Sequence, residues 1–374
     1  MDVTITVDAR TAYTATPRGI GKTLLELYRR VAVLRPQWKF VMFHRQMELN
    51  DPFKNTANIS NKRIECRGDR FDLWREIRLP LAAKRCRADL LHCPGNTAPR
   101  WPLSPMVLTV HDLIPLQPEF VTPASRSWGR NVARAAGKAR RIFTPSEFSK
   151  RQIVKYLNVS ADKIIVNHWA ANPNYSKIVD VDSIRSVRKK YGLEADRPYI
   201  LGFGGIDPRK NTTRILQAWS ALPAELCRNH QLFLMGIHQQ TMTKFKTELE
   251  LLGITESCKL TGYVPDEDMA PLLRGATALC YPTLSEGFGL PVLDAFACET
   301  AVLAAQVTSV PEIAGDAALL VEPHKTEAIT AALIRIMKDE NLRDDLIRRG
   351  RERLKLFTWE NCAARFCTTL EDIL

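Results

Sequence analysis

Short apolar segments alternate with segments of helical periodicity along this chain of 374 residues. Residues 3–7 alternate Val and Ile with Thr, as a strand with one buried face does, and residues 23–34 carry apolar side chains at helical spacing. Because strands that alternate with helices build parallel sheets, this opening predicts a doubly wound α/β domain. Further strands are predicted at 39–43, 90–92, 106–111, 141–144 and 163–167, with a helix at 149–157.

The same alternation begins again after a segment without periodicity. Residues 169–182 contain an Asn-Pro-Asn turn signal, which places a linker there, and a basic helix is predicted at 181–191. Strands are predicted at 199–202, 231–235, 258–261, 278–281, 301–304 and 318–321, and helices at 212–222, 241–252, 269–275, 290–297 and from 327 onward. The chain is therefore expected to hold two units of one architecture, without short repeats.

The composition fits two domains that each bury a core, since 45% of the residues are hydrophobic. The sequence has no apolar run of about 18 residues, and residues 1–10 lack the basic and apolar regions of a signal peptide, so we expect a cytoplasmic protein. The nine cysteines are scattered and never spaced Cys-x-x-Cys. We therefore expect reduced thiols, without a zinc site or disulfides.

Positive charge is concentrated in the first half of the chain. Residues 1–190 hold 34 Lys and Arg against 16 Asp and Glu, a net charge of +18, whereas the remainder carries −6. A basic half attracts an anionic partner, and dense basic runs at 63–87 and 126–141 make an anionic membrane surface one candidate. A solvated basic face without a partner is the alternative. Nucleic acid is not expected, because the seven tryptophans form no periodic aromatic platform.

Two carboxylates flank a glycine-containing turn that is expected to open the helix at 290–297. Glu286 lies before this turn and Asp294 lies more than one turn into the helix, where a carboxylate can accept hydrogen bonds from a ribose diol. Gly287 and Gly289 allow the backbone N–H groups to approach a phosphate or sugar at the helix N-terminus. The arrangement can hold a sugar nucleotide; an ordinary acidic loop between a strand and a helix is the alternative.

This stretch resembles the retaining glycosyltransferases of family four, whose signature is Glu, seven residues, Glu. The resemblance makes Glu286 a catalytic candidate that holds the transferred sugar. The second acid here is Asp294, the candidate for the ribose, and it is one methylene shorter than the family's residue. The resemblance covers nearly the whole chain, because further family segments recur in order. These are residues 8–22 (DARTAYTATPRGIGK), 107–115 (VLTVHDLIP), 143–149 (FTPSEFS), 202–211 (GFGGIDPRKN), 261–266 (TGYVPD) and 310–323.

The resemblance implies the GT-B fold, in which two doubly wound, Rossmann-like parallel-sheet domains face each other across a cleft. Residues 1–176 would then form the acceptor-binding domain and 177–357 the nucleotide-sugar-binding domain. Residues 358–374 would form a terminal helix that crosses back to the first domain. Ligands of such sheets bind at the carboxyl ends of the strands, so candidate residues are sought there.

Arg209 and Lys210 follow the first strand of the second domain, where two cations suit a diphosphate leaving group. The resemblance assigns Lys210 to the phosphates. The family commonly has a further Arg about where Gly205 stands here, so either Arg209 or a group of the acceptor-binding domain is its candidate replacement. A solvated basic turn is the alternative. The other donor-binding candidates in this half are the base-contacting backbone of Tyr263 and Val264, and the loop residues Thr283, Phe288, Gly289 and Leu290.

His111 and Asp112 end a predicted strand of the first domain. A lone His is more often structural, but the resemblance places His111 beside the transferred sugar, where a ring or backbone dipole stabilises positive character at the anomeric carbon. Asp112 is the weaker catalytic candidate. Residues 18–23 (RGIGKT) invite an ATPase interpretation, which fails because Thr16 stands where that motif needs a Gly. The resemblance gives Gly19 and Gly21 a backbone role near the donor phosphate; a loop that caps the first helix is the alternative.

No catalytic metal and no cofactor are expected. Asp180 and Asp182 lie in the linker, and Asp266 and Asp268 open a helix, so neither Asp-x-Asp pair ends a strand. The resemblance implies a hexosyltransferase of surface polysaccharide or lipopolysaccharide assembly, with mannose from GDP-mannose as the first donor candidate and rhamnose or glucose close behind. The acceptor would be a saccharide or a lipid-linked saccharide. A GT-B epimerase or hydrolase of nucleotide-sugars and a basic nucleic-acid-binding protein are the alternatives.

Overall fold

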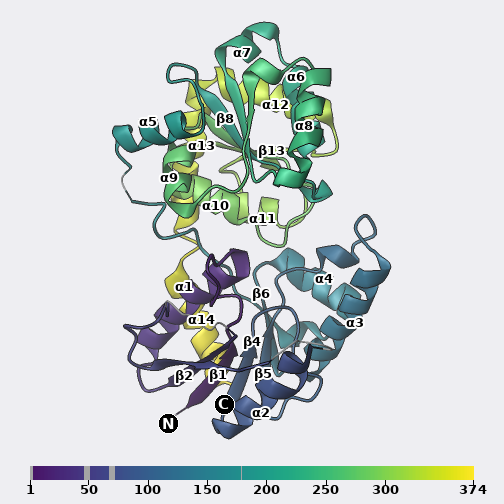
Figure 1. The fold of residues 1–374 in the computed structure, drawn as a ribbon, viewed down its shortest axis with the longest axis vertical. Helices are drawn as coiled ribbons and strands as arrows, with labels where there is room; N and C mark the ends of the chain where they lie inside the picture. Colours follow the sequence, from purple (N-terminus) through teal and green to yellow (C-terminus); the bar gives the residue numbers. More distant parts are fainter. Residues whose placement is uncertain (1–2, 46–50, 67–71, 178) are drawn as a thin grey trace. The chain divides into compact units, whose positions relative to one another are not determined.

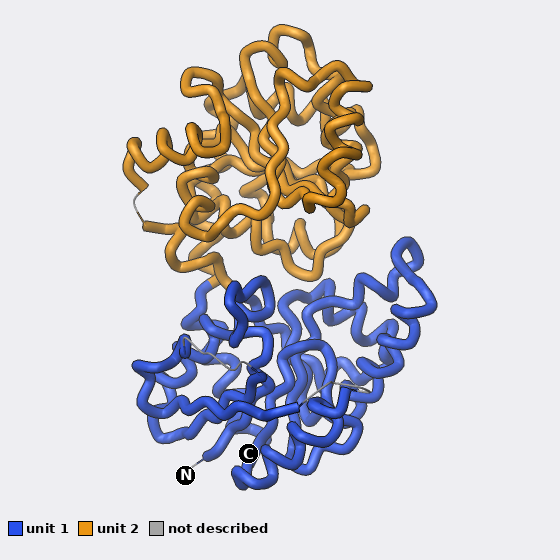
Figure 2. Tube along the Cα trace, viewed as in Figure 1, with its two compact units in different colours: residues 1–169, 358–374 blue, residues 170–357 orange. Residues whose placement is uncertain are grey.

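The structure is a computed structural model that describes residues 3–45, 51–66, 72–177 and 179–374. It divides into two compact units (Figure 2): unit 1 comprises residues 1–169 and 358–374, and unit 2 comprises residues 170–357. The division comes before the expected boundary at residue 176, because the intervening segment is tied to unit 2. The backbone N–H of Asn172 donates to Oδ1 of Asp294 at 2.9 Å, and Tyr175 is buried.

Unit 1 is built on a seven-stranded parallel sheet in the order β3-β2-β1-β4-β5-β6-β7 (Figure 1). The chain moves outward from β1 through β2 to β3 and then restarts on the other side with β4, so the order reverses between β1 and β4. The strands are β1 (Thr4–Asp8), β2 (Lys39–His44), β3 (Ile59–Arg63), β4 (Leu90–Cys93), β5 (Met106–Thr109), β6 (Arg141–Thr144) and β7 (Ile164–Val166).

Helices cover both faces of this sheet. On one face α1 (Gly19–Leu34) packs beside the terminal helix α14 (Trp359–Glu371), and Tyr28 and Phe366 share a core cluster with β1. The core of the other face holds Trp74 and side chains of α2 (Leu79–Arg85), α3 (Pro123–Lys138) and α4 (Glu147–Leu157). The terminal segment thus lies in unit 1, next to the first helix.

Some elements of unit 1 differ from the sequence prediction. β3 and α3 were not predicted, because β3 is an edge strand that buries only Ile59, and α3 buries mainly small residues. A capping box between Thr122 and Ser125 starts α3 despite its polar sequence. The strand expected at 106–111 ends at Thr109, so His111 lies beyond it, and α1 begins at Gly19 instead of residue 23.

Unit 2 repeats the architecture with a six-stranded parallel sheet in the order β10-β9-β8-β11-β12-β13. The order reverses between β8 and β11, which are hydrogen-bonded neighbours. Its strands are β8 (Tyr199–Phe203), β9 (Gln231–Met235), β10 (Cys258–Leu260), β11 (Ala278–Tyr281), β12 (Val302–Ala305) and β13 (Leu319–Val321). Its helices are α5 (Val181–Lys190), α6 (Thr212–Ser220), α7 (Ala224–Asn229), α8 (Gln239–Leu251), α9 (Asp266–Arg274), α10 (Leu290–Ala297), α11 (Val310–Ala314), α12 (Thr326–Lys338) and α13 (Glu340–Leu354).

The sheet order decides which loops meet. In a doubly wound sheet, the loops that follow the two strands at the reversal diverge to opposite faces and leave a ligand crevice. In unit 2 these are the loop after β8, which carries Lys210, and the loop after β11, which carries Glu286. No helix in the described part of the chain is long and apolar enough to cross a membrane.

Candidate active site at the sheet reversal of unit 2

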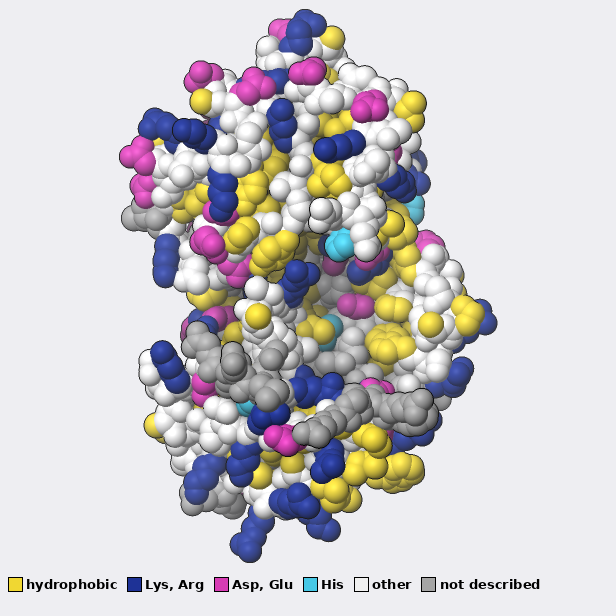
Figure 3. All heavy atoms as spheres, in the orientation of Figure 1, with side chains coloured by type: hydrophobic (Ala, Val, Ile, Leu, Met, Phe, Trp, Pro, Cys, Tyr) yellow, Lys and Arg dark blue, Asp and Glu magenta, His cyan; other side chains and the backbone are white. Residues whose placement is uncertain are grey.

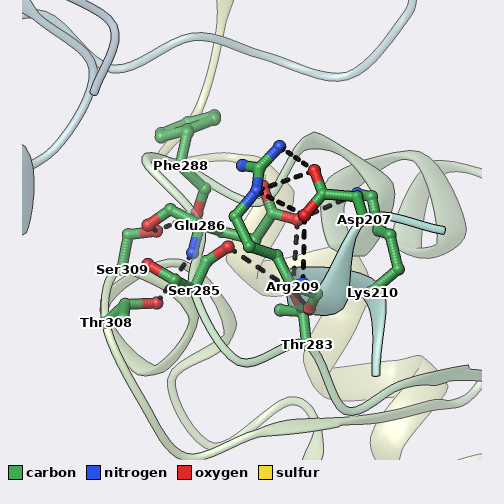
Figure 4. A network of polar contacts seen from close by, with 9 residues as sticks. All are labelled: Asp207, Arg209, Lys210, Thr283, Ser285, Glu286, Phe288, Thr308 and Ser309. Atoms are coloured by element: carbon green, nitrogen blue, oxygen red, sulfur yellow. Dashed lines mark hydrogen bonds and ion pairs between the residues drawn. The ribbon is translucent and has the colours of Figure 1, made fainter. Parts of the chain in front are cut away.

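The loops after β8 and β11 meet through an ion pair (Figure 4). Nζ of Lys210 lies 2.9 Å from Oε1 of Glu286, and both side chains are largely buried, at 28% and 15% exposure. Nζ of Lys210 also lies 5.5 Å from the ring centroid of Tyr281, the buried last residue of β11. The structure therefore brings together the two residues that the sequence assigned to the phosphates and the sugar.

Hydrogen bonds hold the loop that carries Glu286. The Thr283 hydroxyl donates to the carbonyl of Arg209 at 2.7 Å, and its oxygen lies 3.3 Å from Oε1 of Glu286. The backbone N–H of Glu286 donates to the Thr308 hydroxyl at 3.2 Å, and the Ser309 hydroxyl lies 2.8 Å from the carbonyl oxygens of Glu286 and Phe288. Glu286 is thus fixed from both sides before any ligand binds, which lowers the cost of positioning it later.

Thr308 and Ser309 were not among the residues predicted for the site. They lie directly before α11, more than twenty residues after Glu286 in the sequence. The only available signal was the family segment that begins at residue 310, which does not include them. Their hydroxyls complete the loop geometry because β12 lies next to β11 in the sheet.

Arg209 is occupied by its own loop. Its Nε and Nη2 lie 2.9 Å and 2.5 Å from Oδ2 of Asp207. Burial raises the pKa of Asp207, but the hydrogen bonds and charge of Arg209 outweigh it, so the pKa lies below its usual value. A diphosphate would have to compete with Asp207 for this guanidinium.

Asp294 lies in α10 and contacts the start of unit 2. One of its oxygens accepts the Asn172 N–H at 2.9 Å. Burial raises the pKa of Tyr281 well above its usual value, and Glu286 and Asp294 both add to this effect. The two carboxylates of the sequence signature therefore both lie close enough to affect the same buried hydroxyl at the end of β11.

The remaining candidates of unit 2 differ in how far their side chains are exposed. Gly289 is the N-cap of α10 with φ of 117°, a conformation that favours glycine, and half-buried Leu290 follows it. Phe288 is buried against Phe357 with ring centroids 6.2 Å apart, and its carbonyl accepts from the Ser309 hydroxyl. After β10, Tyr263 is 52% exposed whereas Val264 is buried.

In unit 1, His111 is buried at 7% exposure, and three of its polar groups contact neighbours. Its Nε2 contacts the Pro94 carbonyl, its backbone N–H donates to Oδ1 of Asn96 at 2.7 Å, and its carbonyl accepts from Ser149 at 3.2 Å. Burial lowers the pKa of His111 to about 4, against the opposing bond to Pro94, so the ring is neutral near pH 7. Only its dipoles, not a positive charge, can act on a substrate.

The other candidates of unit 1 have clear structural roles. Oδ1 of Asp112 accepts the N–H of Ile114 at 3.1 Å and starts a short turn. Gly19 and Gly21 form the first turn of α1 instead of a loop. A Cβ on Gly21 would lie 2.1 Å from the Thr11 carbonyl oxygen, so only glycine fits this helix start. These contacts fit the alternative in which the segment caps the first helix.

The two Asp-x-Asp pairs start helices. Asp180 is the N-cap of α5, and Asp268 in α9 pairs with Nζ of Lys190 at 2.6 Å. Within the described ranges, no three His, Cys, Asp or Glu side chains are grouped so that they could hold a metal ion. That the reaction needs no metal stays a prediction.

Comparison with known proteins gives consistent results over the whole chain. The glycosyltransferase family 4 model matches residues 17–174, and the model of glycosyl transferases group 1 matches residues 183–353. The O-antigen chain mannosyltransferase B of Escherichia coli is 31% identical over 93% of this chain and 94% of that protein. The MMP alpha-(1->4)-mannosyltransferase of Mycolicibacterium hassiacum is 29% identical over 72% of this chain and 66% of that protein.

Solved structures agree in fold. The structure of Anabaena Alr3699/HepE in complex with UDP and glucose covers 100% of both chains with a TM-score of 0.75 at 16% identity. Such a likeness shows the fold alone, and it confirms the two Rossmann-like domains of the GT-B architecture. Because the E. coli relative is similar over nearly its whole length and both family models follow in order, this chain belongs to the family four glycosyltransferases and is a glycosyltransferase.

Proposed function

We propose that this enzyme is a retaining mannosyltransferase that transfers mannose from GDP-mannose to a saccharide or lipid-linked saccharide during surface polysaccharide synthesis. The observation that carries the proposal is the Lys210–Glu286 pair at the sheet reversal of unit 2. Two relatives whose names describe mannosyltransferases favour mannose over other hexoses. The family resemblance supplies the expectation that anomeric configuration is retained.

The pair suggests how a donor is received. A diphosphate that approaches the site attracts the ammonium group of Lys210 away from Glu286. The carboxylate of Glu286 can then accept hydrogen bonds from the hydroxyls of the sugar. Since the bond between the anomeric carbon and the phosphate oxygen breaks while negative charge grows on the diphosphate, Lys210 stabilises the transition state more than the ground state. Arg209 adds a second cation if the diphosphate displaces it from Asp207.

In the proposed reaction the acceptor oxygen attacks the anomeric carbon from the face that the diphosphate leaves. The acceptor hydroxyl gives its proton to the leaving phosphate oxygen, so the reaction needs no separate protein base. Neutral His111 would stabilise positive character at the sugar through its dipoles alone. Asp294 would accept hydrogen bonds from the ribose diol.

A donor screen tests the function. Purified enzyme is incubated with GDP-mannose, UDP-glucose and dTDP-rhamnose, each with and without lipid-linked saccharide extract, and nucleotide release is measured. GDP release that depends on the acceptor, with an α-linked mannose in the product, is expected. Faster release from another donor would refute mannose, inversion of the anomeric centre would refute retention, and sugar isomerisation without transfer would favour an epimerase.

We further propose that unit 1 binds anionic membranes at their surface, where a lipid-linked acceptor is found. Arg126, Arg130, Arg134 and Lys138 follow at i, i+4 spacing along α3, and all four are exposed, so they form one basic row. Trp101 lies beside this row at 68% exposure, with Nζ of Lys138 5.8 Å from its ring centroid. Figure 3 shows many further Lys and Arg side chains on the visible face of unit 1.

Flotation with liposomes tests the membrane proposal. Each Lys or Arg near an anionic surface contributes about 1 kcal/mol, and salt screens the attraction, so wild-type protein should float with anionic vesicles at low salt only. Arg130→Glu with Arg134→Glu should abolish flotation. Arg185→Glu with Lys189→Glu reverses two charges on α5 of unit 2 and should not. Equal loss in both double variants, or binding to neutral vesicles, would contradict the proposal.

A further inference from the structure

Unit 1 contains a small, partly open pocket that His111 lines. It measures about 30 Å³ and lies between α1, α14 and the ends of the central strands. A cavity of this size holds one water molecule, provided that polar groups surround it. Its polar lining includes His92, Thr109, His111 and Thr144.

Two of these lining residues have buried polar atoms without a hydrogen-bond partner among the described residues. They are Nδ1 of His111 and Oγ1 of Thr144. Thr144 is 1% exposed, and both residues are therefore cut off from bulk water. Because an unsatisfied buried polar atom costs about 1–3 kcal/mol, a polar molecule that bonded both atoms would remove a substantial cost.

The hydrogen-bond directions on either side of the cavity follow from the neighbours. The Tyr28 hydroxyl lies 2.8 Å from Nδ1 of His92, and burial raises the pKa of Tyr28 well above its usual value, so this hydroxyl keeps its hydrogen. If the hydroxyl donates to Nδ1, Nε2 of His92 carries the ring hydrogen and donates to Oγ1 of Thr109 at 2.8 Å. The reverse direction would leave the buried Tyr28 hydrogen without an acceptor among the residues that the structure describes.

The Thr109 hydroxyl is then left with its own hydrogen to donate, and Thr109 lines the cavity. On the far side, Nε2 of His111 contacts the Pro94 carbonyl, which can only accept. The ring hydrogen of His111 must therefore lie on Nε2, and Nδ1 is a bare acceptor that needs a donor. A water molecule has the required groups, since it can accept from Thr109 and Thr144 and donate to Nδ1.

We propose that a water molecule in this cavity joins Thr109 and Thr144 to Nδ1 of His111, and that Thr144 is thereby a positioning residue for His111. The bridge completes a buried chain of hydrogen bonds from Tyr28 through His92 to Pro94, in which every hydrogen points in one direction. A 180° flip of the His111 ring would set the carbon Cε1 against the Pro94 carbonyl and the carbon Cδ2 toward the water, so the chain fixes both the tautomer and the ring orientation. The functional importance of this fixation rests on the proposed function, which places His111 beside the sugar.

The tautomer is measured without any substrate, by long-range ¹H–¹⁵N NMR on protein with ¹⁵N-labelled histidine. At pH 7 His111 should carry its hydrogen on Nε2, and its Nδ1 resonance should show a hydrogen-bonded acceptor. Thr144→Val should move the Nδ1 resonance toward that of an unbonded nitrogen, and Thr144→Ser should restore it. Thr6→Val is the matched control, because Thr6 is equally buried in the same sheet but bonds Leu90 and does not line the cavity.

In transfer assays, Thr144→Val should lower kcat by about three- to tenfold, the effect of one lost hydrogen bond, with the donor KM unchanged. Thr144→Ser should recover most of the rate. A hydrogen on Nδ1 of wild-type His111, an unchanged Nδ1 resonance in Thr144→Val, or a high-resolution crystal structure with a dry cavity would overturn the proposal. The wild-type tautomer and the crystal structure decide it even if Thr144→Val does not fold or the enzyme transfers another sugar.

Discussion

Replacement of Glu286 by Gln is the sharpest test of the active site. The variant keeps the size of the side chain but removes the charge that faces Lys210 at 2.9 Å. At an effective dielectric constant of about 20, a pair at this distance attracts by about 6 kcal/mol, most of which the desolvation of two largely buried groups offsets. Because the variant leaves the Lys210 charge without its counter-charge, while the Gln oxygen can still accept from it, we expect a loss of folding stability of about 1–3 kcal/mol.

The turnover number kcat should fall by much more than this loss of stability would suggest. If Glu286 holds the reacting sugar, loss of a charged hydrogen bond that strengthens in the transition state costs about 2–4 kcal/mol, which lowers kcat by about 30- to 900-fold. GDP affinity should stay within about threefold of wild type, because Lys210 remains and loses a competitor. The assays are nucleotide release for kcat and titration calorimetry for GDP.

Glu299→Gln is the matched control. Glu299 is another paired carboxylate of unit 2, bonded to Arg274 and Arg351, and lies outside the two site loops. It should lose stability without losing rate. A Glu286→Gln enzyme with wild-type kcat, or one whose GDP affinity falls as far as its kcat, would refute the assignment of Glu286 to the sugar.

Four further outcomes are expected. Lys210→Ala should weaken GDP binding more than guanosine binding in calorimetry, and equal weakening would remove Lys210 from the phosphate site. Asp294→Asn should raise the donor KM, although its side chain keeps an oxygen for the Asn172 N–H. With the wild-type enzyme, a 2′-deoxyribose donor should show the same increase in KM; an unchanged KM would refute the ribose contact. Burial lowers the pKa of His92 to about 3, so the unfolded chain binds one more proton than the folded protein between about pH 6.5 and 3. The free energy of unfolding, measured by urea titration, should therefore decrease as the pH is lowered through this window. His92→Gln should reduce the slope of unfolding free energy against pH by about 1.4 kcal/mol per pH unit; equal slopes in the two proteins would contradict the neutral ring. Gly21→Ala should lower Tm, because its Cβ meets the Thr11 carbonyl, whereas Gly137→Ala, with open space around its Cβ, should not; a harmless Gly21→Ala would refute the steric argument.

The sequence by itself determined the architecture. Each strand and each helix buries apolar side chains in a local pattern that can be recognised in the sequence, and the alternation of the two implies parallel sheets covered by helices. It predicted β9, β11 and α10 at their observed bounds, since these segments bury apolar side chains in a clear local pattern. It also singled out the loops of Lys210 and Glu286 from their residue types. It missed β3 and α3, whose polar sequences become ordered through the edge of the sheet and a capping box.

Only the tertiary structure decided which of these residues lie together. Lys210 and Glu286 are 76 positions apart, and they meet because β8 and β11 are neighbours at the reversal of the sheet, a property of strand order that no local pattern contains. The same applies to Thr308 and Ser309, which reach the Glu286 loop from the end of the next strand, and to the burial that keeps His111 neutral. Residue types set which chemistry is available, whereas long-range strand pairing sets the distances and the dielectric surroundings that decide whether it is used.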